Sequence, residues 1–249
     1  MTRKNILITG ASSGLGRGMA IEFAKSGHNL ALCARRLDNL VALKAELLAL
    51  NPHIQIEIKP LDVNEHEQVF TVFHEFKAEF GTLDRIIVNA GLGKGGSVGT
   101  GFFKANLQTA QTNFIAALAQ CEAALEIFRA QNAGHLVTIS SISAVRGFRR
   151  ALTVYAATKS ALTSLTEGIR IDVMDTPIKV SCIHPGFIRT EMNEKVKTAP
   201  FMIDAEAGCK AIVKAINKEK ANSYVPSYPW AIMHLLLRVA PTRLIRRMS

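Results

Sequence analysis

The sequence has little of what marks several other classes of protein. Only 6% of its 249 residues are aromatic, and it contains one tryptophan and four cysteines. The cysteines lack the spacing of metal ligands, so we expect no metal site and interpret them as reduced core thiols of a cytoplasmic protein. They are Cys33, Cys121, Cys182 and Cys209. With no long linker, low-complexity segment or fixed-period repeat, the chain is expected to form one domain.

The sequence also lacks any apolar run long enough to cross a bilayer. The N-terminal stretch MTRKNILITG enters a strand pattern at once, so we expect no signal peptide. Residues 229–241 are the most membrane-like stretch and are too short to span. The net charge of +10 would suit anionic small molecules, an anionic membrane surface or nucleic acid. Because the few aromatic residues are not interleaved with a basic stripe, we expect no nucleic-acid binding.

What the sequence does contain is a regular alternation of short apolar runs and longer helical patterns. Strands are predicted at residues 5–9, 29–34, 135–141 and 223–226, and strands together with the exit or turn that follows them at residues 54–63, 84–91 and 178–186. Helices are predicted at residues 15–26, 37–50, 65–80, 105–130, 152–174 and 204–219. This order indicates an α/β fold, a doubly wound parallel sheet of about seven strands with helices on both faces. Because ligands bind such sheets beyond the carboxyl ends of the strands, the residues after each strand are the candidates for a site.

The turn after the first strand has the composition of a phosphate-binding loop. Its sequence, TGASSGLG at residues 9–16, spaces three glycines as GxxxGxG rather than GxGxxG. Glycines let backbone N–H groups approach a pyrophosphate at the positive end of the next helix. A purely structural turn is the alternative, and the strand and helix around the loop favour phosphate binding. The predicted contacts are Gly10, Ser12, Ser13, Gly14, Leu15 and Gly16.

The second strand ends in two arginines, Arg35 and Arg36. Folds that bind NAD carry an acidic side chain near this place, which accepts from the ribose 2′-hydroxyl. Here Ala34 precedes the arginines, and the first carboxylate is Asp38. A guanidinium can instead bind a 2′-phosphate in a forked geometry. We therefore expect NADP(H) to be preferred over NAD(H), with a solvated surface pair as the alternative.

Short polar segments follow the third and fourth strands. Asp62 and Val63 come where an adenine ring would lie, although a helix N-cap would also explain the aspartate. Asn89, Ala90 and Gly91 suit a turn beneath a cofactor, or a plain turn.

Tyr155 and Lys159 stand four residues apart, on one face of a predicted helix. A tyrosine has a pKa of about 10, and a nearby ammonium favours the phenolate form. Ser141, after the fifth strand, could hydrogen-bond a substrate carbonyl or a developing alkoxide. Taken alone, a Tyr–Lys pair at this spacing is more often an exposed pair on a helix surface.

In this order, the segments resemble those of the short-chain dehydrogenases/reductases of standard length. The resemblance runs from about Lys4 to Tyr228 and rests on TGASSGLG, DV at 62–63, NAG at 89–91, Ser141, YAATK at 155–159 and HPGFIRT at 184–190. It implies a Rossmann-like fold and an oxidoreductase that transfers hydride between a nicotinamide cofactor and a small carbonyl or alcohol substrate. Homodimers or homotetramers are usual in the family.

The resemblance also implies roles for individual residues. Tyr155 would be the general acid or base, and Lys159 would lower the phenol pKa and bind the nicotinamide ribose. Ser141 would polarise the substrate oxygen, and Asn113 would help to hold a water relay to the lysine. Arg35 matches the basic position of NADP-preferring members. The nicotinamide would be cradled by Pro185, Gly186, Ile188 and Thr190.

Three positions depart from the family pattern. Val88 replaces the first asparagine of NNAG, and Ser13 stands where many NADP-preferring members carry a basic residue. Ser141 precedes Tyr155 by one residue more than is commonest, which leaves Ser140 and Ser143 as alternatives for the catalytic serine.

The substrate is less constrained by the sequence. Residues 1–228 are expected to form the nucleotide-binding domain, with a substrate lid at about 190–205. The arginines of RGFRR, residues 146–150, could attract an anionic carbonyl substrate or an acyl-carrier partner, or form a solvated loop.

The last segment, residues 229–249, is basic and amphipathic and carries no acidic residue. It suits an interfacial helix on the inner face of an anionic membrane, which would favour a lipophilic substrate. A helix packed on its own domain or on a sister subunit is the alternative.

Two other functions are compatible with the same fold. A non-catalytic NADP-sensing or regulatory protein could use the same fold, although it would have no reason to keep all of Ser141, Tyr155, Lys159 and Asn113. An epimerase or enoyl reductase is the third possibility. The chain lacks the larger C-terminal region of the first and the wider Tyr–Lys spacing of the second.

Overall fold

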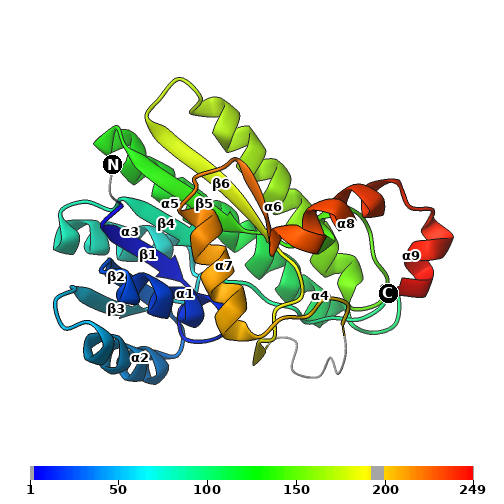
Figure 1. The fold of residues 1–249 in the computed structure, drawn as a ribbon, viewed down its shortest axis with the longest axis horizontal. Coiled ribbons are helices and arrows are strands. Elements are labelled where there is room, and N and C mark those ends of the chain that lie inside the picture. Colours follow the sequence, from blue (N-terminus) through cyan, green and yellow to red (C-terminus); the bar gives the residue numbers. More distant parts are fainter. Residues whose placement is uncertain (1–2, 192–198, 249) are drawn as a thin grey trace.

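The computed structural model describes residues 3–191 and 199–248 (Figure 1). In these ranges one parallel sheet has seven strands in the order β3-β2-β1-β4-β5-β6-β7, which confirms the predicted doubly wound sheet. The strands are β1 Asn5–Thr9, β2 Asn29–Ala34, β3 Ile56–Pro60, β4 Arg85–Val88, β5 Gly134–Ile139, β6 Ile178–Pro185 and β7 Asn222–Val225.

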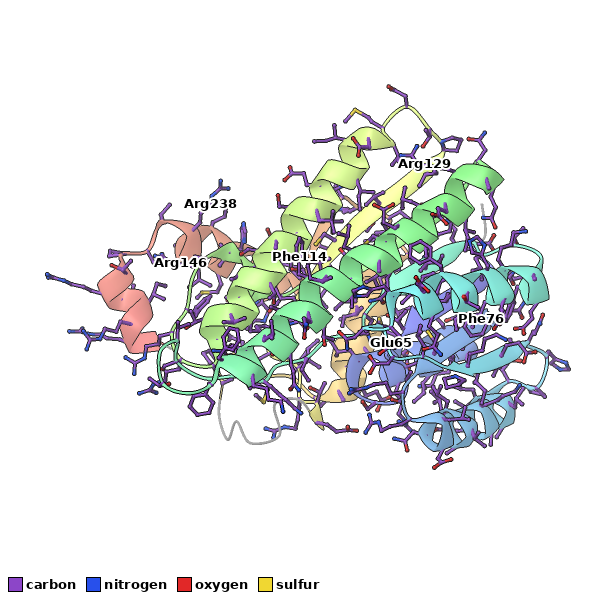
Figure 2. All side chains as sticks on the ribbon, turned by 180° about the vertical axis from the view of Figure 1, so that it is seen from behind. Glu65, Phe76, Phe114, Arg129, Arg146 and Arg238 are labelled. Atoms are coloured by element: carbon purple, nitrogen blue, oxygen red, sulfur yellow. The ribbon has the colours of Figure 1, made fainter. Side chains whose placement is uncertain are left out.

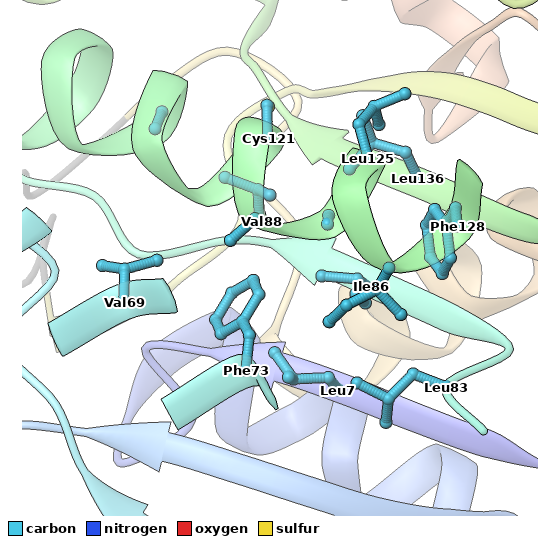
Figure 3. Close-up of a cluster of buried hydrophobic side chains, with 14 of the residues drawn as sticks. Leu7, Val69, Phe73, Leu83, Ile86, Val88, Cys121, Leu125, Phe128 and Leu136 are labelled. Atoms are coloured by element: carbon cyan, nitrogen blue, oxygen red, sulfur yellow. The ribbon is translucent and has the colours of Figure 1, made fainter. Parts of the chain in front are cut away.

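Successive side chains of the central strand enter two different cores. On β1, Leu7 packs into the cluster of α3 His66–Phe80, α5 Ala116–Gln131 and α6 Leu152–Asp172. Figure 3 shows Leu7 there beside Phe73 and Ile86. Ile6 and Ile8 face the opposite way, into the cluster of α1 Gly14–Lys25, α2 Leu37–Leu50 and α7 Ala205–Ile216. Since a strand alternates its side chains between faces, an apolar run buries both faces of the sheet.

The helix predicted at 105–130 is not one regular helix. It consists of α4 Phe103–Ala110, a π-helical turn η1 Gln111–Ile115, and α5. Such bulges often occur at functional sites, and this one carries Asn113. Periodicity did not reveal it, because a five-residue change of pitch barely alters the apolar pattern.

The third and fourth strands end before the polar segments that were predicted to follow them. β3 ends at Pro60 and β4 ends at Val88. Beyond β4, the N–H groups of Asn89 and Ala90 donate to the hydroxyl of Thr9, 3.0 and 3.1 Å away, instead of extending the ladder. These exits put the polar segments at the carboxyl edge of the sheet.

The C-terminal segment forms two helices, α8 Ser227–Val239 and α9 Thr242–Met248. Figure 1 shows them at the end of the molecule toward which the strands run. Trp230, Leu237 and Ile245 pack with Ile142 in a third apolar cluster, so the segment is held against the protein. Of the helices in the described ranges, none is long and apolar enough to cross a membrane.

Candidate active site

The glycine loop packs tightly against the start of α1. Gly10 and Gly14 have φ angles of +66° and +53°, which favour glycine. A Cβ on Gly16 would lie 2.4 Å from the carbonyl oxygen of Gly10. The N-cap residue, Ser13, makes no side-chain capping bond to the helix. The first N–H groups of α1 are thus positioned as an anion site at the positive end of the helix dipole.

The two arginines after β2 differ in what they contact. Arg36 donates from Nε to Ser12 Oγ at 3.3 Å and from Nη2 to Ser13 Oγ at 2.5 Å. The side chain of Arg35 is 68% exposed, and its closest carboxylate contact, with Asp62, is 3.8 Å long. The structure therefore brings Arg36 onto the glycine loop and leaves Arg35 at the rim, a distinction that the sequence did not reveal.

Asp62 is not the N-cap of the next helix. Its Oδ1 accepts from the backbone N–H and the side-chain amide of Asn64, at 3.0 and 2.9 Å. The N-cap of α3 is Glu65. Val63 is buried beneath this turn, so the Asp62–Val63 segment forms a fixed wall near Arg35.

Asn89 ties the turn after β4 to the glycine loop. Its Nδ2 donates to the carbonyl of Thr9 at 2.8 Å. A Cβ on Gly10 would lie 2.9 Å from the Cα of Ala90, so the two turns are in contact through backbone atoms.

Asn113 and Lys159 meet around Gly91. Asn113 Oδ1 accepts from the N–H of Leu92 at 2.7 Å, and its Nδ2 donates to Leu92 O at 2.8 Å and to Thr158 Oγ1 at 3.2 Å. Lys159 Nζ donates to Ile139 O at 2.8 Å. A Cβ on Gly91 would lie 3.4 Å from Asn113 Oδ1 and 3.6 Å from Lys159 Nζ. Residues far apart in the sequence thus form one polar cluster.

The three candidate serines have different surroundings. Ser141 lies close enough to the phenol of Tyr155 to lower its pKa, and the Oγ of Ser141 lies 2.7 Å from the Oγ of Ser143. Ser140 turns toward α6, where its Oγ contacts Lys159 O and Thr163 Oγ1 at 3.1 and 2.8 Å. The structure therefore places Ser141 beside the tyrosine, with Ser143 behind it and Ser140 in the core.

The electrostatics of the pair differ from the expectation that Lys159 lowers the phenol pKa. Burial raises the pKa of Tyr155, and the Ser141 hydroxyl offsets only part of that shift. Burial lowers the pKa of Lys159 to about 8. The ammonium lies 5.9 Å from the centre of the phenol ring and donates to Ile139 O. In this state, Tyr155 is protonated at neutral pH and able to act as an acid.

The segment after β6 returns over the glycine loop. A Cβ on Gly14 would lie 3.8 Å from Thr190 Cβ. Gly186, next to Pro185, donates its N–H to Val225 O at 2.8 Å, and Ile188 is buried and bridges to Ile203. Of the expected lid at 190–205, residues 192–198 lie outside the described part of the chain.

Two residues near this segment, Trp230 and His184, were not predicted to belong to the site, whereas Arg146 was a candidate for attracting an anionic substrate. Trp230 Nε1 would touch a Cβ on Gly186, 2.0 Å away, so only glycine fits there; this buried Nε1 has no hydrogen-bond partner among the described residues. His184 is buried with Nδ1 3.4 Å from the carbonyl of Ser141. Arg146 donates to the carbonyls of Leu237 and Ala240. The sequence features that could have identified the first two are the single tryptophan and the histidine of HPGFIRT.

Comparison with known proteins decides the family. A family model described as short chain dehydrogenase matches residues 4–200. The chain belongs to this family. It is an oxidoreductase of the short-chain dehydrogenase type, as the sequence motifs predicted.

Relatives of this short-chain dehydrogenase support the same assignment. An uncharacterized oxidoreductase of Mycobacterium tuberculosis is 48% identical, covering 100% of this chain and 98% of that protein. An NADP-dependent 3-hydroxy acid dehydrogenase of Schizosaccharomyces pombe is 33% identical, covering 76% of this chain and 73% of that one. A crystal structure of a short chain dehydrogenase/reductase from Burkholderia phymatum, in complex with NAD, shares the fold with a TM-score of 0.85 at 21% identity, covering 100% and 98% of the two chains.

The residues of this short-chain dehydrogenase fit a nicotinamide dinucleotide. The test is geometric: a Cβ on Gly16 would collide with the carbonyl of Gly10, whereas a Cβ on Gly91 would meet Asn113 and Lys159 at ordinary contact distance. The glycine loop therefore packs directly on the N-terminus of α1, where its backbone could hold a pyrophosphate. The pyrophosphate would lie on the glycine loop, and the nicotinamide would lie between Gly91 and Gly186.

Proposed function

We propose that the protein is an NADP(H)-dependent oxidoreductase that interconverts a ketone or aldehyde and the corresponding alcohol. The observation that carries the proposal is the cluster at the carboxyl edge of the sheet. It brings Ser141 close enough to Tyr155 to affect the pKa of the phenol, and it puts Lys159 and Asn113 around Gly91. A phenol, a hydroxyl and an ammonium in one place can stabilise and protonate an oxyanion.

Each side chain has one task in this mechanism. When bound, the cofactor supplies or accepts the hydride. Ser141 donates a hydrogen bond to the substrate oxygen, and Tyr155 gives its proton to that oxygen as alkoxide character develops. In the reverse direction, the Tyr155 phenolate takes the proton. The ammonium of Lys159 stabilises the phenolate left after proton transfer and binds the ribose of the nicotinamide.

Asn113 supports the proton path through the backbone. The side-chain amide of Asn113 both accepts from and donates to the backbone of Leu92. These two hydrogen bonds fix the π-helical turn to the turn after β4. We infer that this fixed frame positions the water that restores the proton.

Preference for NADP(H) is supported by Arg36, which reaches Ser12 and Ser13 on the glycine loop and whose guanidinium could there bind a 2′-phosphate. The Schizosaccharomyces pombe relative is named as NADP-dependent, which supports the same choice. We also infer a homo-oligomer, because Phe103 and Leu107 on α4 are 76% and 41% exposed and form an apolar surface.

The experiment is a fluorescence titration of the purified protein with NADPH and with NADH, followed by a screen of ketones and aldehydes with the tighter cofactor. We expect NADPH to bind at least about tenfold more tightly and to be oxidised by part of the panel. Binding without turnover of any carbonyl would favour the non-catalytic sensing function. Binding of neither cofactor would overturn both.

A further inference from the structure

Helix α8 is apolar on two opposite faces. Its inward face carries Trp230 and Leu237, which are 3% and 6% exposed in the third apolar cluster. Its outward face carries a row of large apolar side chains at helical spacing, i, i+3, i+4 and i+7. That row is Ile232, Leu235, Leu236 and Val239, which are 53%, 63%, 54% and 79% exposed.

The same surface is strongly positive. Exposed arginines border the row at its end and along α9: Arg238, Arg243, Arg246 and Arg247. Leu244, between them, is 48% exposed. The sequence carries no Asp or Glu after Glu219, and none of the four arginines forms an ion pair with the described residues. Figure 2 shows Arg238 at the outer surface of this end of the molecule.

This surface is presented by an anchored element rather than by a loose tail. Arg146 donates from Nη1 to Leu237 O at 2.8 Å and also to Ala240 O, where α8 ends. Ile245 of α9 is 5% exposed in the third cluster. The outward row therefore stays exposed while the inward faces of α8 and α9 are buried.

We propose that the outward face of α8 and α9, called here the tail face, docks on the surface of an anionic lipid bilayer. Ile232, Leu235, Leu236, Val239 and Leu244 enter the boundary between headgroups and acyl chains. The arginines lie at the level of the headgroups, where each adds electrostatic attraction to anionic lipid. The inference stands independently of the reaction proposed above.

Charge favours a bilayer over a second copy of this chain. A two-fold contact brings the same surface of both copies together. It would here confront one set of four arginines with another, with no Asp or Glu side chain on either tail face. Like charges in such a contact oppose association. An anionic bilayer provides both an apolar layer and the opposite charge.

The test is vesicle flotation of the full chain. The probes are vesicles of phosphatidylglycerol mixed with phosphatidylcholine, and vesicles of phosphatidylcholine alone. We expect flotation with the anionic vesicles only. This binding should weaken as salt rises from 0.05 to 0.5 M, because the electrostatic screening length falls with ionic strength.

Two pairs of variants make the test specific. Leu235→Ser/Leu236→Ser should weaken binding by about tenfold or more, and Arg243→Gln/Arg247→Gln by about fivefold for each arginine. The matched controls are Ile171→Ser/Met174→Ser, equally exposed apolar residues of and after α6, and Lys210→Gln/Lys214→Gln on α7. The controls should float like the unmodified protein, and all four should melt as it does by circular dichroism.

Absence of flotation with anionic vesicles would overturn the proposal. So would equal flotation of the tail-face variants and their controls. If light scattering instead shows that only the tail-face variants lose an oligomer that the unmodified chain forms without lipid, the face is an interface between copies.

Discussion

Nη2 of Arg36 lies 2.5 Å from Oγ of Ser13, and Nε lies 3.3 Å from Oγ of Ser12. This arginine therefore closes over the glycine loop from the end of β2. Arg35, its neighbour, points to the rim. The two cations differ in position, and they should differ in what they contribute to cofactor choice.

Arg36→Ala should weaken NADPH binding by about 10- to 100-fold, because a charge-assisted contact with the 2′-phosphate is lost. NADH binding should change by no more than about twofold, since its ribose carries no phosphate. Fluorescence titration of both cofactors measures the difference. Arg35→Ala is the matched control and should have the smaller effect on NADPH binding. Equal losses of affinity for both cofactors in Arg36→Ala would show that the arginine only stabilises the loop.

Tyr155→Phe removes the only proton donor that the mechanism places at the substrate oxygen. We expect kcat to fall by about 10²- to 10⁴-fold, the range for a positioned acid or base. The dissociation constant for NADPH should stay nearly unchanged, because the ring is kept. Stopped-flow turnover and cofactor titration of the same preparation test both statements. Normal turnover would show that another group carries the proton.

Substitution of Ser141 and substitution of Ser140 should have different effects, and the difference tests which serine is catalytic. Ser141→Ala should lower kcat by about 10²- to 10³-fold with little change in thermal stability, since its Oγ faces the phenol. Ser140→Ala should instead lower the melting temperature, because the buried contacts of its Oγ with Lys159 O and Thr163 Oγ1 are lost. Turnover measured against melting temperature distinguishes the two. The reverse pattern would move the catalytic role to Ser140.

A buried polar network at the opposite edge of the sheet predicts acid sensitivity. Arg85 Nε donates to His135 Nδ1 at 2.9 Å, and His135 Nε2 bonds Ser181 at 2.8 Å, so the ring is neutral. Burial and the charge of Arg85 lower the pKa of His135 to about 3. Burial raises the pKa of Glu219, but the Arg3 hydrogen bond and nearby charges outweigh it and hold the pKa at about 2.

Both shifts destabilise the fold in acid. Below pH 6.5, the ordinary pKa of histidine, His135 binds a proton in the unfolded chain but stays unprotonated in the folded protein. The free energy of unfolding should then fall by about 1.4 kcal/mol per pH unit for that proton. Glu219 stabilises above its ordinary 4.5 and loses this contribution as pH falls toward 2.

Thermal melts between pH 7.5 and 4.5 measure this loss. His135→Gln can still accept from Arg85 and donate to Ser181 without titrating, so its melting temperature should fall less steeply. Identical slopes for the two proteins would assign the acid sensitivity to other groups.

Much of this fold was predictable because its signals are local. The apolar runs at Ile6–Ile8 and Leu30–Leu32 specify buried strands, and Gly81 ends α3 where the sequence stops being helical. The motif order placed Tyr155, Lys159 and the glycine loop at one edge, since parallel strands point the same way.

What the sequence did not reveal depends on contacts between distant residues. The difference between Arg35 and Arg36 arises from how the chain leaves β2 relative to Ser12 and Ser13. The burial of Trp230 against Gly186 joins residues 44 positions apart, and the upward shift of the Tyr155 pKa reflects the whole surrounding core. Neither periodicity nor spacing encodes such distances.

The π-helical turn at Gln111–Ile115 makes the site depend on chain length. Such a turn holds one residue more than an α-helix closes over. Deleting a single residue of η1 would let the segment close as regular α-helix, with α4 and α5 keeping their relative orientation and the backbone of the former turn shifting locally. Asn113 could then no longer both accept from and donate to Leu92, although every sequence motif of the family would still be present. We therefore expect that a homologue with a gap of one residue here lacks these two hydrogen bonds even where its motifs are intact.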